Sequence, residues 1–193
     1  MTKPRFLIDA DEVLVNFVDP AIEAISQVLG RPWSLDEAPS DTWDMFGGLP
    51  PDVQQEVDRI IDAPGWCSEL EPYPGSQEAV HELEKRCEVI VLTSPRRRAR
   101  QWVYERNLSL LRYFGIRRDR IIQTAAKYVC AGMFYLDDNP DHVVSWQREP
   151  YNAESIGMFW STKHNARLTQ HNDIRVRSWD EVIGLVERRA GAA

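Results

Sequence analysis

Two aspartates one residue apart follow a short apolar run near the start of the chain. The run 6–8 leads directly into Asp9, and Asp11 follows after a single alanine. In extended chain, positions i and i+2 point to the same side, so both carboxylates are expected to share one small space. Two like charges about 4 Å apart repel by roughly 4 kcal/mol at an effective dielectric of about 20. A divalent cation or a bound proton relieves that repulsion, and both suit chemistry on phosphate. A strand that runs into an acidic turn is the alternative for this stretch alone.

Further reactive residue types follow apolar runs later in the chain. They are a hydroxyl pair, a lysine and a second acidic pair: Thr93, Ser94, Lys127, Asp137 and Asp138. Ligands of open parallel sheets bind beyond the carboxyl ends of the strands, so these groups are expected to meet Asp9 and Asp11 at one edge. Lys127 lies ten residues before Asp137, and we expect it near the start of a helix that precedes that strand. A solvated helix lysine and a simple acidic turn are the alternatives.

The elements that would position these groups alternate between apolar and amphipathic segments. Near-continuous apolar runs, typical of strands covered on both faces, are found at Arg5–Asp9, Glu88–Thr93, Arg120–Gln123, Met133–Asp137 and Ser155–Trp160. Helical periodicity is found at Gly75–Arg86, Arg97–Phe114 and Trp179–Arg189, the last of which Ser178 would cap. The alternation predicts an α/β fold, a Rossmann-like parallel sheet with helices on both faces.

The segment between the first and second strands breaks this alternation. It contains helical patterns at Pro20–Leu29 and Asp52–Ile61, joined by a stretch that carries Pro, Trp and Gly. We interpret 15–71 as a helical cap inserted after the first strand. Residues 1–14 and 72–193 then form the core.

The composition narrows the classes of function. At 193 residues, the chain fits one domain with an insertion. Its net charge of −7 argues against a broad nucleic-acid or membrane surface, but not against a small phosphorylated ligand. No apolar run reaches the roughly 18 residues of a membrane span, and a signal peptide is not expected. The 3 cysteines lack CxxC spacing, which disfavours a disulfide framework and a zinc site and favours the cytoplasm.

Taken together, the motifs resemble those of the haloacid dehalogenase-like (HAD) hydrolase superfamily. Its motifs are DxDx(V/T)(L/V), a strand that ends in Thr/Ser, a lysine and a late acidic pair. Within it, the chain is most similar to the 5'(3')-deoxyribonucleotidases. The features that carry this likeness are Glu69-Leu70-Glu71-Pro72, Leu92-Thr93-Ser94-Pro95, His164-Asn165 and Ser178-Trp179. One departure is Glu12, where those nucleotidases usually carry glycine, and it is expected to alter how the cap meets the site.

The resemblance implies Mg²⁺-dependent hydrolysis of a phosphomonoester through an aspartyl-phosphate. Asp9 would be the nucleophile and Asp11 the general acid and base. The implied Mg²⁺ ligands are the Asp9 side chain, the Asp11 backbone carbonyl, and Asp137 or Asp138. The implied substrate is a small phosphate ester, with a nucleoside or deoxynucleoside monophosphate favoured. Another small phosphate ester, or a non-catalytic module that binds a phosphorylated ligand, is the alternative.

The same resemblance assigns residues to the phosphate. Thr93 or Ser94, with backbone N–H groups, would bind phosphoryl oxygens. Lys127 would neutralise charge on both nucleophile and phosphate. Arg96, just after this strand, is a further candidate for substrate binding, and a solvated surface arginine is its alternative.

Aromatic residues of the cap are candidates for binding a nucleobase. Trp43, Phe46 and Trp66 offer ring faces on which a base can stack, although packing between small helices is the alternative for each. His164 and His171 are seven residues apart, but nothing nearby completes a metal site, so His164 is expected to order a loop. A Trp-rich surface is compatible with a homodimer.

Overall fold

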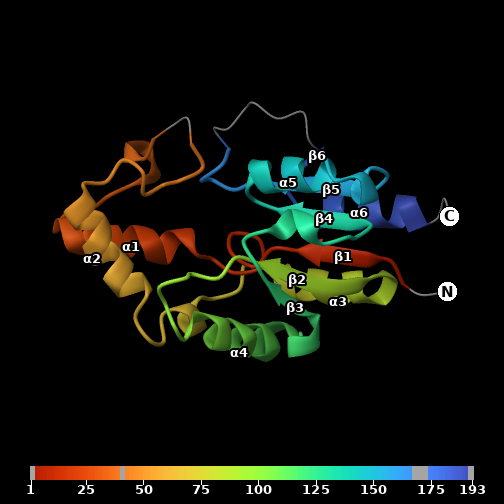
Figure 1. Ribbon diagram of the computed structural model, residues 1–193, viewed down its shortest axis with the longest axis horizontal. Helices are drawn as coiled ribbons and strands as arrows, with labels where there is room; N and C mark the ends of the chain where they lie inside the picture. The colour runs from red at the N-terminus through yellow and green to blue at the C-terminus, as the bar shows by residue number, and fades with distance from the viewer. Residues whose placement is uncertain (1–2, 40–41, 167–173, 191–193) are drawn as a thin grey trace.

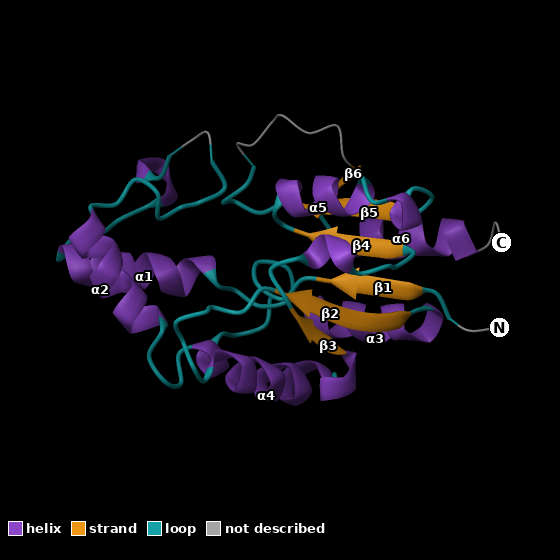
Figure 2. Ribbon diagram, in the orientation of Figure 1, coloured by secondary structure: helices purple, strands orange, loops and turns teal. Residues whose placement is uncertain are grey.

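The computed structural model describes residues 3–39, 42–166 and 174–190. Its described strands form one parallel sheet of six, in the order β3-β2-β1-β4-β5-β6 (Figure 2). The bounds are β1 Arg5–Ile8, β2 Glu88–Thr93, β3 Ile121–Gln123, β4 Phe134–Asp137, β5 Ile156–Trp160 and β6 Ile174–Val176. The predicted α/β class is therefore confirmed.

Helices cover both faces of this sheet. Four follow the strands of the core: α3 Ser76–Arg86, α4 Trp102–Phe114, α5 Pro140–Gln147 and α6 Trp179–Ala190. On β1, Phe6 and Ile8 belong to the same buried cluster as side chains of α3 and α6, whereas Leu7 joins the cluster that includes α5. This alternation along one strand places helices on opposite sides of the sheet. Within the described ranges, no helix combines the length and apolar character needed to cross a membrane.

Two helices lie beyond the carboxyl ends of the strands, toward which the arrows of Figure 1 point. They are α1 Val18–Leu29 and α2 Pro51–Ile61, and they pack against each other. Their buried side chains form a separate apolar cluster, which Trp102 at the start of α4 also joins. This cluster joins residues of the segment 15–71, which we interpret as a cap, to the start of α4.

Short 3₁₀ helices complete the described structure: Leu35–Glu37, Cys67–Glu69, Arg118–Arg120, Lys127–Val129 and Pro150–Asn152. One of them corrects a prediction, because Lys127 begins a 3₁₀ turn and not an α-helix. Only ten residues separate the end of β3 from the start of β4, which is too short for a helical crossover. Helix α4 also starts later than predicted, at Trp102.

Candidate active site

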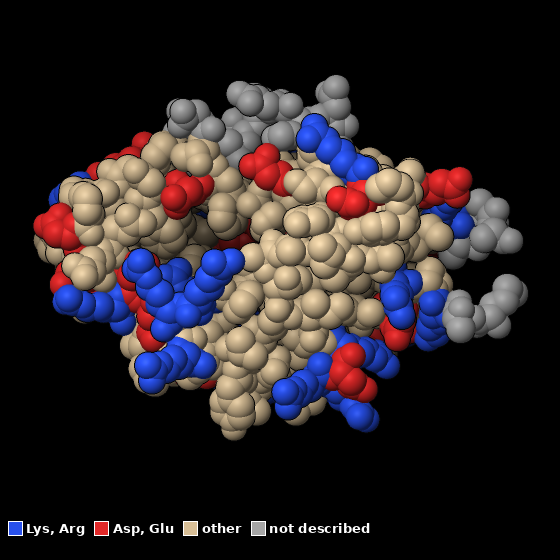
Figure 3. Space-filling view, viewed as in Figure 1, with Lys and Arg blue, Asp and Glu red and all other residues tan. Residues whose placement is uncertain are grey.

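A cavity of about 280 Å³ lies between the cap and the carboxyl ends of the strands. Figure 3 shows the corresponding hollow, with acidic side chains visible inside it and Lys and Arg side chains gathered beside it. Charged groups line the core side and apolar groups line much of the cap side. Of the predicted site residues, the lining includes Asp9, Asp11, Trp43, Phe46, Ser94, Arg96, Lys127 and Asp138. Thr93, Asp137 and Trp66 lie outside this lining.

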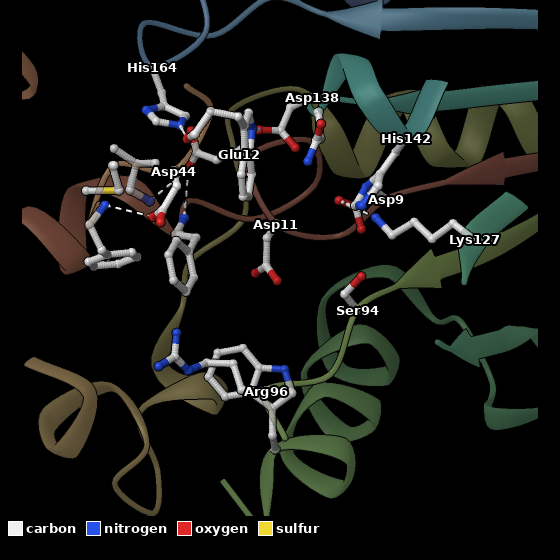
Figure 4. Close-up of a pocket in the computed structure, with 17 residues that line it drawn as sticks. Asp9, Asp11, Glu12, Asp44, Ser94, Arg96, Lys127, Asp138, His142 and His164 are labelled. Atoms are coloured by element: carbon white, nitrogen blue, oxygen red, sulfur yellow. Dashed lines mark hydrogen bonds and ion pairs between the residues drawn. The ribbon is translucent and has the colours of Figure 1, made fainter. Parts of the chain in front are cut away.

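Asp9 stands at the point where β1 ends. Its backbone N–H donates to the carbonyl of Leu136 at 2.9 Å, which continues the pairing with β4. One carboxylate oxygen accepts from the N–H of Ala10 at 2.8 Å, and the other lies 2.8 Å from the ammonium of Lys127. The side chain is thus buried but held with one face toward the cavity (Figure 4).

Asp11 lines the same cavity as Asp9, but strand alternation does not bring the two carboxylates together, so that part of the prediction is wrong. Strand β1 ends at Ile8, and hydrogen bonds from Leu14 and Val15 to Ala10 turn the chain, so the strand alternation no longer applies. Figure 4 shows the carboxylate of Asp11 directed away from Asp9. It forms an ion pair with Arg106 of α4.

Three carboxylates from two distant segments meet at the floor of the cavity. One oxygen each of Asp9, Asp137 and Asp138 lies within 4.8 Å of the others. Asp137 accepts hydrogen bonds from Lys127 at 2.7 Å, from the N–H of Asn139 at 2.9 Å and from the hydroxyl of Tyr135. The lysine thus bridges the ends of β1 and β4, and the oxygens are a donor set suited to Mg²⁺.

This cluster carries more negative charge than its lysine balances. Burial, with repulsion from Asp137 and Asp11, raises the pKa of Asp9 to about 6, despite the opposing effect of Lys127. Burial and the neighbouring carboxylates Asp137 and Asp9 hold the pKa of Asp138 well above its usual range. Burial also acts to raise the pKa of Asp137, but Lys127 and His142 together outweigh it, and the pKa is lowered. A divalent cation fits this site because it would neutralise the excess charge.

The remaining phosphate candidates occupy the end of β2. Ser94 lines the cavity, and its hydroxyl donates to the carbonyl of Thr124 at 3.4 Å. The Thr93 hydroxyl is buried and has no hydrogen-bond partner among the described residues. The structure therefore brings Ser94 to the cavity and leaves Thr93 beneath it.

The cap aromatics divide into two groups. Trp43 and Phe46 line the cavity, and the indole N–H of Trp43 donates to Asp138 at 3.2 Å. Trp66 instead packs against Phe17 and Trp102, with ring centroids 5.3 Å and 6.0 Å away. The packing alternative thus describes Trp66, whereas Trp43 and Phe46 line the cavity.

Histidine 164 and its neighbour are placed as the sequence predicts, in a loop. The amide of Asn165 donates to the carbonyls of Asp138 and Trp160, both at 2.8 Å. A ring nitrogen of His164 contacts the carbonyl of Trp43, so this loop also meets the cap. His171 lies outside the described residues.

Arg96 lines the cavity, yet its guanidinium is engaged with the cap. It lies 2.7 Å from Asp58 on α2 and 2.6 Å from Asp62, the residue that follows α2. These half-buried ion pairs fasten α2 to the loop after β2. The placement gives Arg96 a structural role beside its candidate role in substrate binding.

Glu12, which we expected to alter how the cap meets the site, contacts the cap directly. Its carboxylate accepts from the N–H groups of Phe17 and Val18, at 2.9 Å and 2.8 Å, and from the hydroxyl of Tyr73 at 2.9 Å. Its φ of 59° is the left-handed conformation in which glycine is favoured. Burial raises its pKa to about 7. The residue that departs from the nucleotidase pattern therefore binds the start of the cap helix α1.

Arg106 and His142 were missed. His142 lines the cavity with Nδ1 3.4 Å from Asp137, and nothing in the sequence of its short helix indicated this position.

For Arg106, the sequence does contain a pattern that indicates burial. The buried positions of α4 are Trp102, Glu105, Arg106, Ser109 and Leu110, which follow the i, i+3, i+4, i+7, i+8 pattern of an inward helix face. Charged residues on such a face need partners inside the protein.

With this geometry established, comparisons with known proteins give the family. The family model of the 5' nucleotidase, deoxy (pyrimidine), cytosolic type C proteins matches residues 3–191. The cytosolic-type 5'(3')-deoxyribonucleotidase of Homo sapiens is 30% identical over 155 residues, 78% of this chain and 75% of that protein. The mitochondrial 5'(3')-deoxyribonucleotidase of Homo sapiens is 29% identical over 143 residues, 71% of this chain and 63% of the relative's length.

Solved structures give the fold. A HAD family hydrolase from Deinococcus radiodurans R1, solved with bound phosphate and sodium, superposes with a TM-score of 0.65. The match covers 98% of this chain and 96% of that one at 16% identity, which establishes the HAD-like fold. Together with the family match, it confirms the resemblance drawn from the motifs. The chain belongs to the 5' nucleotidase, deoxy (pyrimidine), cytosolic type C family, a family of phosphoric monoester hydrolases.

Proposed function

We propose that the protein hydrolyses phosphomonoesters with Mg²⁺ and through an aspartyl-phosphate on Asp9, and that its substrates are nucleoside or deoxynucleoside monophosphates. The observation that carries this proposal is the buried cluster of Asp9, Asp137 and Asp138 with Lys127, open to a capped cavity. Family membership and the names of the human relatives support the substrate class.

The chemistry begins with the carboxylate of Asp9. A carboxylate oxygen attacks phosphorus in line, the bond to the leaving oxygen breaks, and an acyl phosphate forms on Asp9. Lys127, whose charge is secured by Asp137 and Asp9 although burial opposes it, balances the negative charge of nucleophile and phosphate. Mg²⁺ would be held by the Asp9 side chain, the Asp11 carbonyl and Asp137 or Asp138, where it would screen the phosphoryl charge.

Asp11 serves the proton transfers in this proposal. The cycle begins with Asp11 protonated: it gives this proton to the departing oxygen and, as a carboxylate, regains one from the water that attacks the acyl phosphate. Ser94, which lines the cavity, binds a phosphoryl oxygen in this proposal. Thr93, beneath the cavity, would support this loop from below.

In this proposal, residues of the cap surround the leaving group of the substrate. Trp43, Phe46 and Phe17 give the cavity an apolar side that suits a nucleobase.

The proposal also includes the division of the chain into a cap, 15–71, and a core formed by 1–14 and 72–193. A cytoplasmic location and a homodimer stay predictions from the sequence.

A substrate panel tests the proposed function. Phosphate release from dUMP, dTMP, ribonucleoside monophosphates and sugar phosphates is measured with and without Mg²⁺. We expect kcat/KM to be highest for a nucleotide and to depend on Mg²⁺. A sugar phosphate as the best substrate would overturn the substrate class. No Mg²⁺-dependent release from any ester would overturn the enzyme proposal and favour the binding module.

The affinity for Mg²⁺ is expected to rise with pH. The pKa of Asp9 is raised to about 6 and that of Asp138 well above its usual range, so both bind protons that a metal must displace. Below about pH 6, the affinity should therefore fall about tenfold per pH unit for each proton displaced.

Calorimetric titration across this range, in buffers of different ionisation enthalpy, measures the affinity and the protons released together. The matched control is Asp119→Asn, at an exposed carboxylate far from the cavity, which should leave both unchanged. An affinity that does not vary between about pH 5 and 7 would contradict the proposed ligand set.

A further inference from the structure

Arg106 is a charged residue on the buried face of α4, directly beside the candidate acid and base. Its side chain is completely buried, and one terminal nitrogen forms the ion pair with Asp11. The other two nitrogens, Nε and Nη1, have no hydrogen-bond partner among the described residues. A guanidinium buried with so few hydrogen-bond partners is costly, and its ion pair with Asp11 offsets part of that cost.

An aromatic surface fixes the orientation of this guanidinium. Its central carbon lies 5.4 Å from the centroid of the Trp102 ring, four residues earlier on the same helix face. Trp102 is itself stacked on Trp66 of the cap, with ring centroids 6.0 Å apart and planes inclined by 24°. The guanidinium is thus held between an indole ring and a carboxylate, and its freedom to rotate is small.

Asp11, by contrast, has little else to hold it. It follows the end of β1, in a turn where its backbone forms an isolated bridge with Val15 and no strand pairing among the described residues. A quarter of its side chain is exposed to the cavity. A general acid must lie within hydrogen-bond reach of the oxygen that it protonates, so a carboxylate on a turn needs a fixed partner.

We propose that Arg106 is a positioning residue that holds the carboxylate of Asp11 in place for proton transfer, through an ion pair supported by the ring of Trp102. This inference rests on the function proposed above and extends it to a residue outside the known motifs of the sequence. The alternative is that Arg106 only balances buried charge and contributes to folding.

Leaving groups of different basicity separate these two roles. A nucleoside leaves as a basic alkoxide, which needs a proton from Asp11. The p-nitrophenolate ion is a weak base and leaves without one. If Arg106 acts through Asp11, its replacement should slow the first step for the nucleotide far more than for p-nitrophenyl phosphate. A purely structural role would lower both rates by the same factor.

The experiment compares Arg106→Met and Arg106→Lys with the unchanged protein. Turnover of the best nucleotide is measured beside the initial burst of p-nitrophenolate, and the fold is checked by circular dichroism. We expect Arg106→Met to lower kcat for the nucleotide about 100-fold and Arg106→Lys about tenfold. The burst rate should change less than about threefold in both variants. Arg112→Met, at an exposed arginine of the same helix, is the matched control and should change neither rate.

Two reference variants distinguish failure of the positioning role from failure of the proposed function. Asp11→Asn should show the same dependence on the leaving group as the Arg106 variants, and Asp9→Asn should lack both activities. Equal losses on both esters, or no loss in either Arg106 variant, would overturn the positioning role while leaving the proposed function intact. Activity retained in Asp9→Asn would overturn the proposed function itself. If Arg106→Met does not fold, Arg106→Lys decides the question, since it keeps a buried cation but cannot reproduce the planar stacking on Trp102.

Discussion

Asp9→Asn is expected to abolish turnover and to leave the fold intact. The amide of asparagine cannot attack phosphorus, so kcat should fall on the order of 10⁴-fold or more. The same change removes a charge that the folded protein disfavours, because burial raises the pKa of Asp9 from 3.8 to about 6.

The sign of the stability effect follows from that shift. A carboxylate whose pKa is higher in the folded state contributes stability below its unfolded pKa and loses it as pH rises through the folded value. At pH 7.5 without metal, Asp9→Asn should therefore melt at the same temperature as the unchanged protein or higher. Differential scanning calorimetry and a phosphate-release assay measure both quantities. Near-normal activity in this variant would remove Asp9 as the nucleophile, and a large drop in Tm would contradict the account of its charge.

Lys127→Met is expected to damage both stability and catalysis. The ammonium lies 2.8 Å from Asp9 and 2.7 Å from Asp137, and all three side chains are buried. Removing it leaves an uncompensated cluster of carboxylates, which should lower the free energy of unfolding by about 3–5 kcal/mol without metal. Loss of its charge at the phosphate should lower kcat about 10²–10³-fold.

Adding Mg²⁺ tests whether the stability lost in Lys127→Met comes from uncompensated charge in this cluster. A cation that binds the folded cluster should recover part of the lost stability of Lys127→Met, because binding to the folded state alone raises the free energy of unfolding. Lys85→Met, at an exposed lysine on α3, is the control and should change the stability by less than about 0.5 kcal/mol. Urea unfolding with and without Mg²⁺ measures these differences. A Lys127→Met protein as stable as the control would show that Lys127 does not balance the cluster.

The sequence sufficed to predict the main frame of the fold because that frame depends on residue type alone. Apolar runs of four to six residues located β1, β2, β4 and β5 to within about a residue of their bounds. Strand β6 was missed because Ile174-Arg175-Val176 is not a continuous apolar run, and α5 was missed because eight residues give a weak helical period. A helix was predicted in the connection before β4, but its ten residues are too few for a helical crossover.

The candidate site was predictable only where its residues end strands. Asp9, Ser94, Asp137 and Asp138 meet at one edge because parallel strands bring their carboxyl ends together. The direction of the Asp11 side chain could not be predicted from strand alternation, because the chain has already turned at that point.

Contacts between the cap and the core could not be predicted from the sequence either. Neither the hydrogen bonds of Glu12 to the start of α1 nor the ion pair of Arg106 follows from local pattern, since each joins segments that only the folded chain brings together. Trp66 illustrates the same limit. As an aromatic residue of the cap it could have faced a substrate or the core, and packing against Trp102 placed it outside the cavity lining.

The central claim is that acidic side chains from distant segments gather around one magnesium ion beside a nucleophilic Asp9. A crystal grown with Mg²⁺ and beryllium fluoride, an analogue of an acyl phosphate, tests it directly. We expect the fluoride complex on a carboxylate oxygen of Asp9, and Mg²⁺ bound by Asp9, the carbonyl of Asp11, and Asp137 or Asp138. A structure in which both ligands bind elsewhere, or in which Asp9 lies apart from Asp137 and Asp138 with no ion between them, would contradict the account.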